Sequence, residues 1–327
     1  MKKKDIKFVF GIMAYNQEKE ILFTLNSIKY QVLEYGKDVI NTLIITDDNS
    51  MDRTTEVIDL WLKINGTLFG SIIKRFNAKN KGVVDNYHYI LDRIEDEPFK
   101  IIAGDDVISR KNIYLSFDRI SGHTLYIGNE FFFKNERVHL EQSWLYRHFY
   151  LMNHRINKKH YLRLFKMGFV ISTPQTLYSK ELYTDSNARA LNSKFRLFED
   201  NPTWYSMIKN ISDLDIIYAI YPVVLYRISE KSISNQIGKV NNAFQNELYK
   251  LHDQYIQDGG LFDKIYFRSL RSNAPKFFNF SKYIDKIFFF YCRLYSRMYK
   301  KKFELFMDTV NEELVNEQKH LSYIAAM

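Results

Sequence analysis

The fold is decided by residues 8–32, which read FVFGIMAYNQEKEILFTLNSIKYQV. The uncharged apolar run at 8–14 predicts a buried β-strand, whereas the apolar residues of 21–32 recur at helical spacing. This stretch therefore predicts a strand that leads through a polar turn into a helix.

The same alternation recurs along the first part of the chain. Residues 42–46 and 71–75 predict two more strands, 57–64 and 83–94 predict helices, and 99–103 predicts a fourth strand. Such alternation is typical of parallel strands joined by right-handed helical crossovers. We therefore predict an α/β fold with a mostly parallel central sheet.

The later part of the chain is less regular. Residues 124–133 and 215–226 each predict one further strand, and the pattern is mostly helical from about Asn246. We expect one domain at 1–245 and a helical, basic and aromatic C-terminal extension at 246–327.

The composition bounds the class of protein. With 327 residues, 46% apolar and 26% charged, the chain is expected to fold, and 12 glycines and 5 prolines exclude collagen-like and low-complexity sequences. The single cysteine, Cys292, excludes an internal disulfide and a cysteine-based zinc site. We expect a cytoplasmic protein.

The sequence predicts neither a signal peptide nor a transmembrane helix. Lysines precede the first apolar run, but Lys7 interrupts it and no small-residue cleavage pattern follows, so we interpret it as a strand. The longest uncharged apolar stretch, residues 216–226, is far shorter than the roughly 20 residues that span a bilayer.

The formal net charge of +9 suggests an anionic partner. Residues 142–180 contain no acid, and Asp285 is the only acid between 264 and 303. Residues 284–298 form an amphipathic pattern with apolar and basic stripes. Two interpretations stay open for this helix: attachment to an anionic membrane surface, or packing in the core with a solvated basic side.

Two polar clusters follow predicted strands. Gly104-Asp105-Asp106 offers adjacent carboxylates that can hold a divalent cation, although an ordinary turn has the same composition. Asp47-Asp48-Asn49-Ser50 offers a carboxylate to the imide of a uracil, or else forms an Asx turn and helix cap. Ligands gather at the carboxyl ends of parallel strands, so we expect the two clusters at one edge of the sheet.

Two further clusters lie later in the chain. Glu199-Asp200 can supply a general base, or simply place acids at the positive end of a helix. Arg227, Lys231 and Ser232 can hold phosphate oxygens, or belong to a solvated loop.

Several enzyme classes lack support in the sequence. The eight histidines have no paired metal-binding spacing, and GxGxxG, GxxxxGK[ST] and GxSxG are absent. This argues against histidine-based zinc catalysis, dinucleotide enzymes, P-loop NTPases and serine hydrolases.

The order and spacing of six segments between about Phe8 and Asn235 resemble the inverting GT-A glycosyltransferases of family 2. These segments are FGIMAYNQEKEILFTLNSI (10–28), LIITDDNSMDRTTEVI (43–58), NAKNKGVVDNYHYIL (77–91), IIAGDDVI (101–108), LFEDNPTW (197–204) and LYRISEKSIS (225–234). The resemblance implies the Rossmann-like GT-A fold and a nucleotide-sugar donor, usually a UDP-sugar, bound over the strand ends.

The resemblance also implies roles for individual residues. Asp200 would be the catalytic base of a single displacement that inverts the anomeric configuration, and Asp105 with Asp106 would hold Mg²⁺ or Mn²⁺. Nucleotide-binding positions would be Ala14, Tyr15, Asn16, Asp47, Asp48, Asn80, Gly82, Asn86 and Asp105. Diphosphate or acceptor positions would be Glu199, Arg227, Lys231 and Ser232.

The sequence departs from the family pattern in two ways. Ala103 replaces the first aspartate of the Asp-x-Asp signature, and the QxxRW signature and membrane helices of processive synthases are absent. We therefore expect non-processive transfer to a saccharide or lipid-linked acceptor. By the resemblance, the pathway would be capsule, lipopolysaccharide or exopolysaccharide synthesis, in the cytoplasm or on the inner face of the membrane.

Three other functions have weaker support in the sequence. A sugar-1-phosphate nucleotidyltransferase would need an N-terminal Gly-rich basic loop that GIMAYNQEKE lacks. A non-catalytic nucleotide- or glycan-binding scaffold with the same fold is the main alternative, favoured by Ala103 and the basic tail. No recognised motif supports nucleic-acid binding.

Overall fold

The computed structural model describes residues 6–117, 120, 122–169, 173–183, 186–229, 242–272 and 280–327. The chain forms two compact units, which we call unit 1 and unit 2. Unit 1 consists of Met1–Leu140, Ser172–Ile228 and Val310–Met327, and unit 2 of Glu141–Ile171 and Ser229–Thr309.

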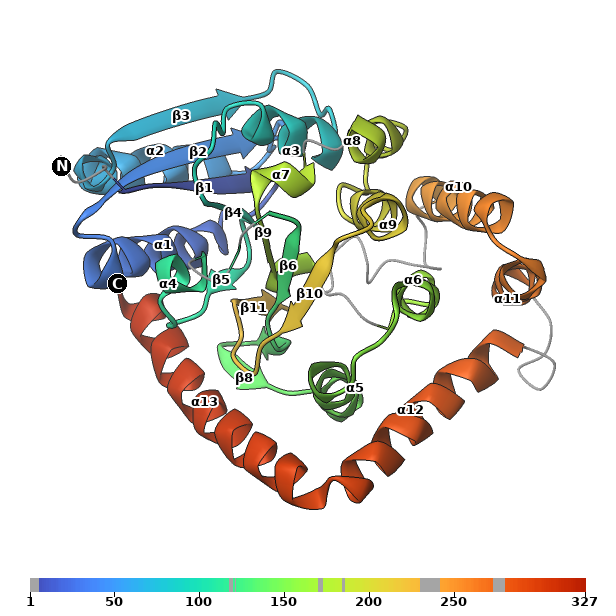
Figure 1. Cartoon of the computed structure of the whole chain (residues 1–327). Coiled ribbons are helices and arrows are strands. Elements are labelled where there is room, and N and C mark those ends of the chain that lie inside the picture. The colour runs from blue at the N-terminus through green and yellow to red at the C-terminus, as the bar shows by residue number, and fades with distance from the viewer. Residues whose placement is uncertain are drawn as a thin grey trace, which may run out of the picture. The chain divides into compact units, whose positions relative to one another are not determined.

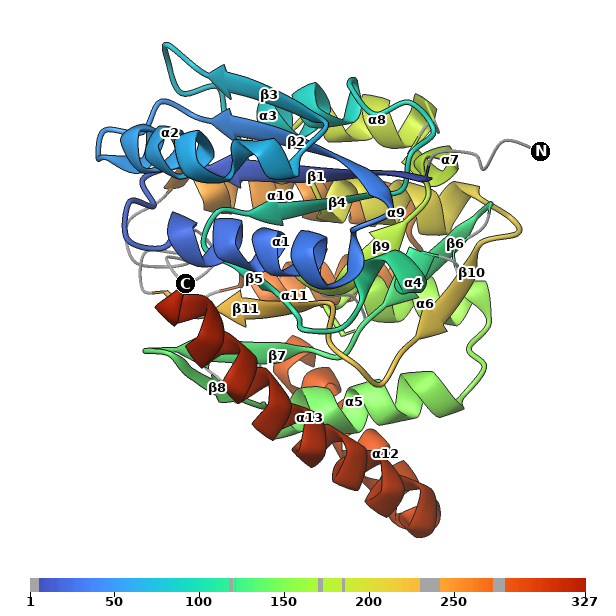
Figure 2. The ribbon, with the colours of Figure 1, turned by 90° about the vertical axis from the view of Figure 1, so that its left-hand side faces the viewer.

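Unit 1 is built on a four-stranded parallel sheet with the order β3-β2-β1-β4 (Figures 1 and 2). Its strands are β1 (Ile6–Ala14), β2 (Val39–Asp47), β3 (Ser71–Phe76) and β4 (Phe99–Ala103). The crossover helices are α1 (Ile21–Tyr35), α2 (Thr54–Asn65) and α3 (Val83–Leu91). A short 3-10 turn, η1 (Gly66–Leu68), follows α2. The predicted parallel α/β sheet is confirmed.

The register of this sheet brings the strand ends together. Ala14 lies opposite Asp47, and Asp47 lies opposite Phe76, while Met13 on the other side pairs with Ala103. The chain leaves β1 toward β2 and returns to β1's other edge in β4, so the order reverses beside β1. In open α/β sheets such a reversal is the place where ligands bind.

The sheet is stabilised by apolar side chains on one face of β1. Phe8, Phe10 and Ile12 are fully or almost fully buried, and they belong to one core with Leu25 and Ile28 of α1. Alternate residues of a strand share a face, which explains the spacing of these three. The apolar residues that predicted this strand and helix are therefore buried in the structure.

Two smaller sheets complete unit 1. One has the order β10-β6-β9 and the other β5-β11-β7-β8. Their strands are β5 (Val107–Ile108), β6 (Thr124–Ile127), β7 (Phe131–Lys134), β8 (Arg137–His139), β9 (Thr176–Tyr178), β10 (Asp215–Tyr218) and β11 (Val224–Arg227). The other elements of unit 1 are α4 (Ile113–Phe117), η2 (Thr173–Gln175), α7 (Lys180–Tyr183), α8 (Ser186–Asn192) and α9 (Asn201–Asn210).

The predictions of single strands at 124–133 and 215–226 are wrong. Each segment forms two short strands that belong to different sheets. The first breaks at Gly128, where an added Cβ would lie 2.9 Å from the backbone nitrogen of Val223. The second breaks around Pro222, which has no N–H to donate to a sheet. The two breaks lie together, because Asn129 donates its backbone N–H to the Tyr221 carbonyl.

Unit 2 is helical and rich in aromatic contacts. Its helices are α5 (Gln142–Asn153), α6 (Lys158–Lys166), α10 (Asn242–Asp258), α11 (Leu261–Arg271) and α12 (Phe280–Met298). The first residues of α13 (Lys300–Ala326) also belong to unit 2, and the rest of that helix belongs to unit 1. Phe149 of α5 packs its ring within 5.0 Å of the Phe303 ring. The mostly helical character expected from about Asn246 is confirmed.

The division between 1–245 and 246–327 stays a prediction. The contacts group the chain differently, since both units draw on separated segments. Among the described helices, none combines the length and the apolar composition that a bilayer-spanning helix needs.

Candidate functional site

The loops that follow β1 and β2 are joined by hydrogen bonds. The Asn16 backbone N–H donates to Ser50 Oγ over 2.8 Å, and Met51 N–H donates to Asn16 Oδ1 over 2.8 Å. Gln17 N–H donates to Thr54 Oγ1 over 2.7 Å. Asn16 has a φ of 52°, a left-handed conformation that asparagine tolerates better than most residues. These side chains fix two loops that the sheet register only places side by side.

Asp47 lies beneath this pair of loops. It is buried, and its carboxylate accepts hydrogen bonds from both the backbone N–H (2.8 Å) and the hydroxyl (2.5 Å) of Ser50. Ala14 is also buried, whereas Tyr15 beside it is 46% exposed. The geometry favours the Asx-turn interpretation for Asp47 and leaves the Tyr15 ring available to a ligand.

Asp48 organises a third loop, which connects β3 to α3. One carboxylate oxygen accepts hydrogen bonds from Lys81 N–H (2.7 Å) and Asn77 Nδ2 (3.1 Å), and the other accepts from Gly82 N–H (2.9 Å). Asp48 is only 6% exposed, so these donors replace most of its water. The carboxylate therefore holds the loop in one conformation.

Gly82 and its neighbours complete this loop. Gly82 has a φ of +94°, and an added Cβ would lie 2.3 Å from Arg196 Cγ and 2.7 Å from the Arg196 carbonyl. Asn86 is buried and donates from Nδ2 to the Gly82 carbonyl over 3.0 Å. Asn80 donates to the Asp48 carbonyl over 3.1 Å, and its own carbonyl accepts from the Arg196 guanidinium over 3.1 Å. Four of the predicted residues are thus brought together here.

Asp105, Asp106 and Arg227 form a second cluster, at the end of β4. Asp106 is buried and accepts the Arg227 backbone N–H over 2.9 Å, while Arg227 Nε donates to the Asp105 carbonyl over 2.7 Å. The guanidinium lies over the rings of Phe23 and Phe133, at 4.7 and 4.3 Å from their centroids. Its Nη2 is buried and has no hydrogen-bond partner among the described residues. A buried donor without a partner is costly, so this nitrogen is suited to an anionic ligand.

The cluster also has unusual electrostatics. Burial raises the pKa of Asp105 to about 6, with the Arg227 charge opposing, and burial raises the pKa of Asp106 well above its usual range. Asp105 is half-buried, and among the described residues no other residue donates a hydrogen bond to its carboxylate. Asp105 is therefore the more available of the two predicted metal ligands.

The carboxylates at the end of β4 fit a cation whose remaining ligands come from a substrate and water. Within the described part of the chain, no group of three or more His, Cys, Asp or Glu side chains is arranged to hold a metal. Mg²⁺ usually takes one or two carboxylates together with substrate phosphates and water. Asp105 can supply such a carboxylate.

Glu199 and Asp200 stand at the start of α9. Asp200 is its N-cap and accepts the Asn201 backbone N–H over 2.6 Å. Burial, and then the charge of Asp200, raise the pKa of Glu199 to about 8. The backbone carbonyl of Arg196, shortly before this pair, accepts the Val84 N–H over 3.2 Å at the start of α3. This contact ties the segment that carries Glu199 and Asp200 to the loop held by Asp48.

Some residues fall outside these two clusters. Lys231 and Ser232 lie outside the described residues. Arg196 and Asn77 take part in the site but were not predicted from the sequence. Arg196 is separated from Asn80 by 116 positions, and nothing in its own neighbourhood indicated the contact.

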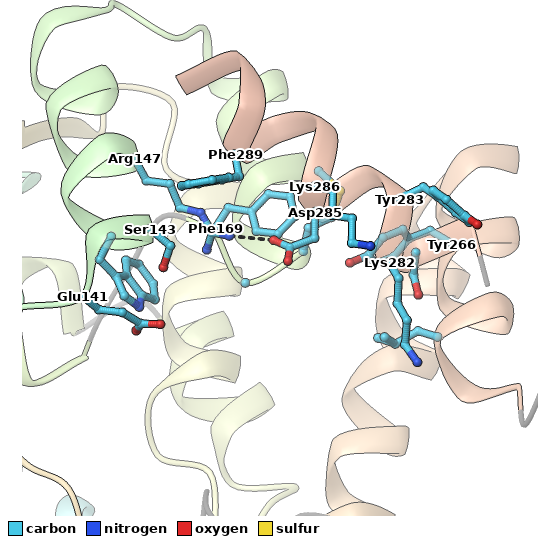
Figure 3. A pocket seen from close by; sticks show the side chains of 15 residues that line it. Glu141, Ser143, Arg147, Phe169, Tyr266, Lys282, Tyr283, Asp285, Lys286 and Phe289 are labelled. Carbon is cyan, nitrogen blue, oxygen red and sulfur yellow. Dashed lines mark hydrogen bonds and ion pairs between the residues drawn. The ribbon is translucent and has the colours of Figure 1, made fainter. Parts of the chain in front are cut away.

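Unit 2 has a pocket of its own, with a volume of about 850 Å³ (Figure 3). The Arg147 guanidinium, from α5, pairs with Asp285 of α12 over 2.6 Å and lies 5.0 Å from the centroid of the Phe169 ring. Other lining residues are Glu141, Trp144, Tyr266, Lys282, Lys286 and Phe289. The pocket contains none of the predicted site residues, and it combines aromatic rings with charges of both signs.

Unit 1 is an α/β unit whose polar loops are joined by hydrogen bonds at the carboxyl ends of parallel strands. Residues 10–185, more than half of the chain, match the family described as Glycosyl transferase family 2. The chain belongs to this family and is a glycosyltransferase. The family resemblance seen in the sequence is confirmed.

Among solved structures similar to the chain, one supports the fold with a TM-score above 0.5. S. aureus TarS 1–349 in complex with UDP-GlcNAc has a TM-score of 0.54 and 15% identity, covering 83% of this chain and 68% of that one. S. aureus TarS has a TM-score of 0.49 and 17% identity, covering 78% of this chain and 40% of that one. The UDP complex of TarS 1–349 has a TM-score of 0.49 and 14% identity, covering 80% and 78%. No curated protein sequence matches the chain. The predicted GT-A fold with C-terminal helices is confirmed.

Proposed function

We propose that this protein transfers a sugar from a UDP-sugar to a hydroxyl of a saccharide or lipid-linked acceptor, with inversion. The observation that carries the proposal is the Asp48 carboxylate, which ties the loop after β3 to the end of β2. We call Asp48 and the loop that it holds, residues 77–82, the rim. A rigid rim of this kind suits a nucleotide at the carboxyl ends of the strands. The UDP-GlcNAc complex of TarS, which shares the fold, supports a donor of this class.

The diphosphate would lie beside Asp105 and Arg227. Arg227 Nη2 is a buried donor without a partner among the described residues, and a phosphate oxygen would satisfy it. Asp105 would hold Mg²⁺ or Mn²⁺, and the bound cation would neutralise charge on the departing diphosphate. Tyr15 would offer its exposed ring to the base.

The transfer is a single displacement. The acceptor oxygen forms a bond to the anomeric carbon as the bond from that carbon to the diphosphate oxygen breaks, and UDP departs with the electron pair. Asp200 accepts the proton of the acceptor hydroxyl. Glu199, with a pKa raised to about 8 by burial and then by the charge of Asp200, stays protonated at neutral pH. A neutral neighbour lets Asp200 act without a second carboxylate beside it.

The pathway and location complete the proposal. The transfer would be non-processive and would serve surface-polysaccharide synthesis, and the enzyme would lie in the cytoplasm or on the inner face of the membrane.

The test is nucleotide release from UDP-, GDP-, CMP- and dTDP-sugars, with and without Mn²⁺. We expect metal-dependent release from a UDP-sugar, lost in Asp105→Ala and kept in Asp38→Ala, whose side chain is exposed on the surface of unit 1. Nucleotide binding without release in the presence of acceptor mixtures would favour the non-catalytic scaffold instead.

A further inference from the structure

Helix α12 exposes a continuous apolar stripe. The stripe runs over the whole 19-residue helix and consists of Phe280, Tyr283, Ile287, Phe290, Leu294 and Met298. The spacings of three and four residues place these side chains on one face. Ile287, Phe290 and Met298 are 66%, 64% and 71% exposed. Contiguous apolar surface of this kind marks an interaction site.

The position of α12 within unit 2 is fixed by a different face. Ser281, Cys292 and Ser296 are buried, and Phe288 stacks on Phe169 with ring centroids 5.0 Å apart. Asp285 points to α5, where it pairs with Arg147 (Figure 3). At the start of the stripe, the Phe280 ring packs against Phe262 of α11 with centroids 6.4 Å apart. Ile287, Phe290, Leu294 and Met298 remain exposed on the face opposite this packing, and their exposure needs another explanation.

A basic row runs alongside the stripe. Lys282, Lys286, Arg293 and Arg297 recur at helical spacing and are exposed. None of the four has an ion-pair partner among the described residues, and the only acid of α12, Asp285, is already paired. The row is thus a line of cations without a counter-charge in the described part of the chain.

We propose that α12 lies in the interface of an anionic membrane, with the apolar stripe inserted among the acyl chains and the basic row against acidic headgroups. An interfacial helix needs this combination of a wide apolar face and flanking Lys and Arg. Tyr283 has an amphipathic ring, which favours the headgroup region, and Phe280 and Phe290 add apolar area to the inserted face.

A second copy of the chain fits this surface less well than a membrane does. A partner helix of the same sequence would cover the stripe but would bring four more cations and no free carboxylate. An anionic lipid surface supplies both the apolar layer and the counter-charge.

Flotation of the full chain with vesicles tests the proposal. We expect binding to phosphatidylcholine vesicles containing phosphatidylglycerol at low salt, and little binding to phosphatidylcholine alone. Ile287→Ser/Phe290→Ser should weaken partitioning by about tenfold or more, because two inserted side chains are lost. Arg293→Gln/Arg297→Gln should weaken it by about tenfold and lower its salt dependence.

Matched controls lie on unit 1. Leu60→Ser/Ile64→Ser removes two exposed apolar side chains of α2, and Lys37→Gln/Lys63→Gln removes two exposed cations. Both should bind vesicles like the wild type. Equal losses in the controls, binding that ignores lipid charge, or no binding at low salt would overturn the proposal. So would a dimer, detected by light scattering, that only the α12 variants dissociate.

The membrane proposal does not rest on glycosyl transfer. Nucleotide release is measured in solution with the same variants, and the α12 substitutions should leave it unchanged. Failure of either activity is therefore distinguishable from failure of the other.

Discussion

Charged side chains have opposite surroundings at the strand ends of unit 1 and on helix α12 of unit 2. Asp48 is buried, with hydrogen bonds from three residues, whereas the four basic residues of α12 are exposed and have no ion-pair partner among the described residues. Satisfied buried charge fixes a shape before any ligand arrives. Exposed charge without an ion-pair partner, beside an exposed apolar stripe, is the basis on which we propose a partner outside the protein. In our proposals the first region positions a ligand and the second attaches the protein to a membrane.

The largest effect on activity is expected at Asp200, the proposed catalytic base. Asp200→Asn keeps an oxygen that can cap α9, so the fold should survive, but an amide cannot take the acceptor proton. We expect kcat to fall by about 10²–10⁴-fold. Steady-state nucleotide release with acceptor present measures this, with Asp38→Asn as the control. A loss of less than about threefold would contradict the assignment of the base.

Removing the central carboxylate of the rim should cost stability. Asp48→Ala leaves the Lys81 and Gly82 N–H groups and the Asn77 amide without their acceptor. We expect the free energy of unfolding to fall by about 3 kcal/mol, measured by urea denaturation. Asp59→Ala breaks only an exposed ion pair with Lys74 and should cost less than about 1 kcal/mol. Equal losses would mean that the rim is no more rigid than the surface.

Two glycines allow the same comparison at the backbone. Gly82 and Gly168 both have positive φ, but a Cβ at Gly82 would collide with Arg196, whereas nothing lies within 4 Å of one at Gly168. We expect Gly168→Ala to cost about 1 kcal/mol and Gly82→Ala about 2 kcal/mol or more. Thermal unfolding of the two variants measures the difference, and equal shifts would show that the close contact with Arg196 relaxes freely.

The smallest effect concerns pH. Glu317, in the part of α13 that belongs to unit 1, is buried and accepts the Ser109 hydroxyl over 2.6 Å, and burial raises its pKa to about 7. Between about pH 4.5 and 7 the folded carboxyl keeps a proton that the unfolded one has lost. Its contribution therefore lowers the free energy of unfolding as pH rises, by at most about 1.4 kcal/mol per pH unit.

Glu317→Gln should remove this slope. Urea denaturation at pH 5, 6 and 7 would measure it as the difference between wild type and variant. A difference that is constant across this range would place the pKa of Glu317 near that of an exposed glutamate.

Much of unit 1 could be predicted because its signals are local. The strand-to-helix alternation of residues 8–103 follows from apolar spacing, and the polar clusters stand where strands end. The strands predicted at 124–133 and 215–226 failed because their apolar composition fits one long strand as well as two short ones. Only the close approach at Gly128 and the position of Pro222 divide them between sheets.

The site divides in the same way. The sequence pointed to Asp48 as part of a polar cluster after a strand, and to Gly82 through the family resemblance. It did not show that the Asp48 carboxylate accepts the backbone N–H of Gly82. Arg196 could not be found at all, because its contact with Asn80 depends on how a distant segment packs. Similarly, Asp105 and Asp106 read alike in the sequence, and only burial distinguishes them.

The sequence by itself determined the fold class, the family and the edge of the sheet where the polar loops lie, since these depend on periodicity and on motifs in order along the chain. Tertiary structure alone decided which carboxylates accept hydrogen bonds within the protein, and which face of α12 is exposed. The amphipathic pattern allowed either membrane attachment or core packing. The structure shows which face of α12 is buried and which is exposed. Burial depends on the residues that pack against the helix, and these are distant in the sequence.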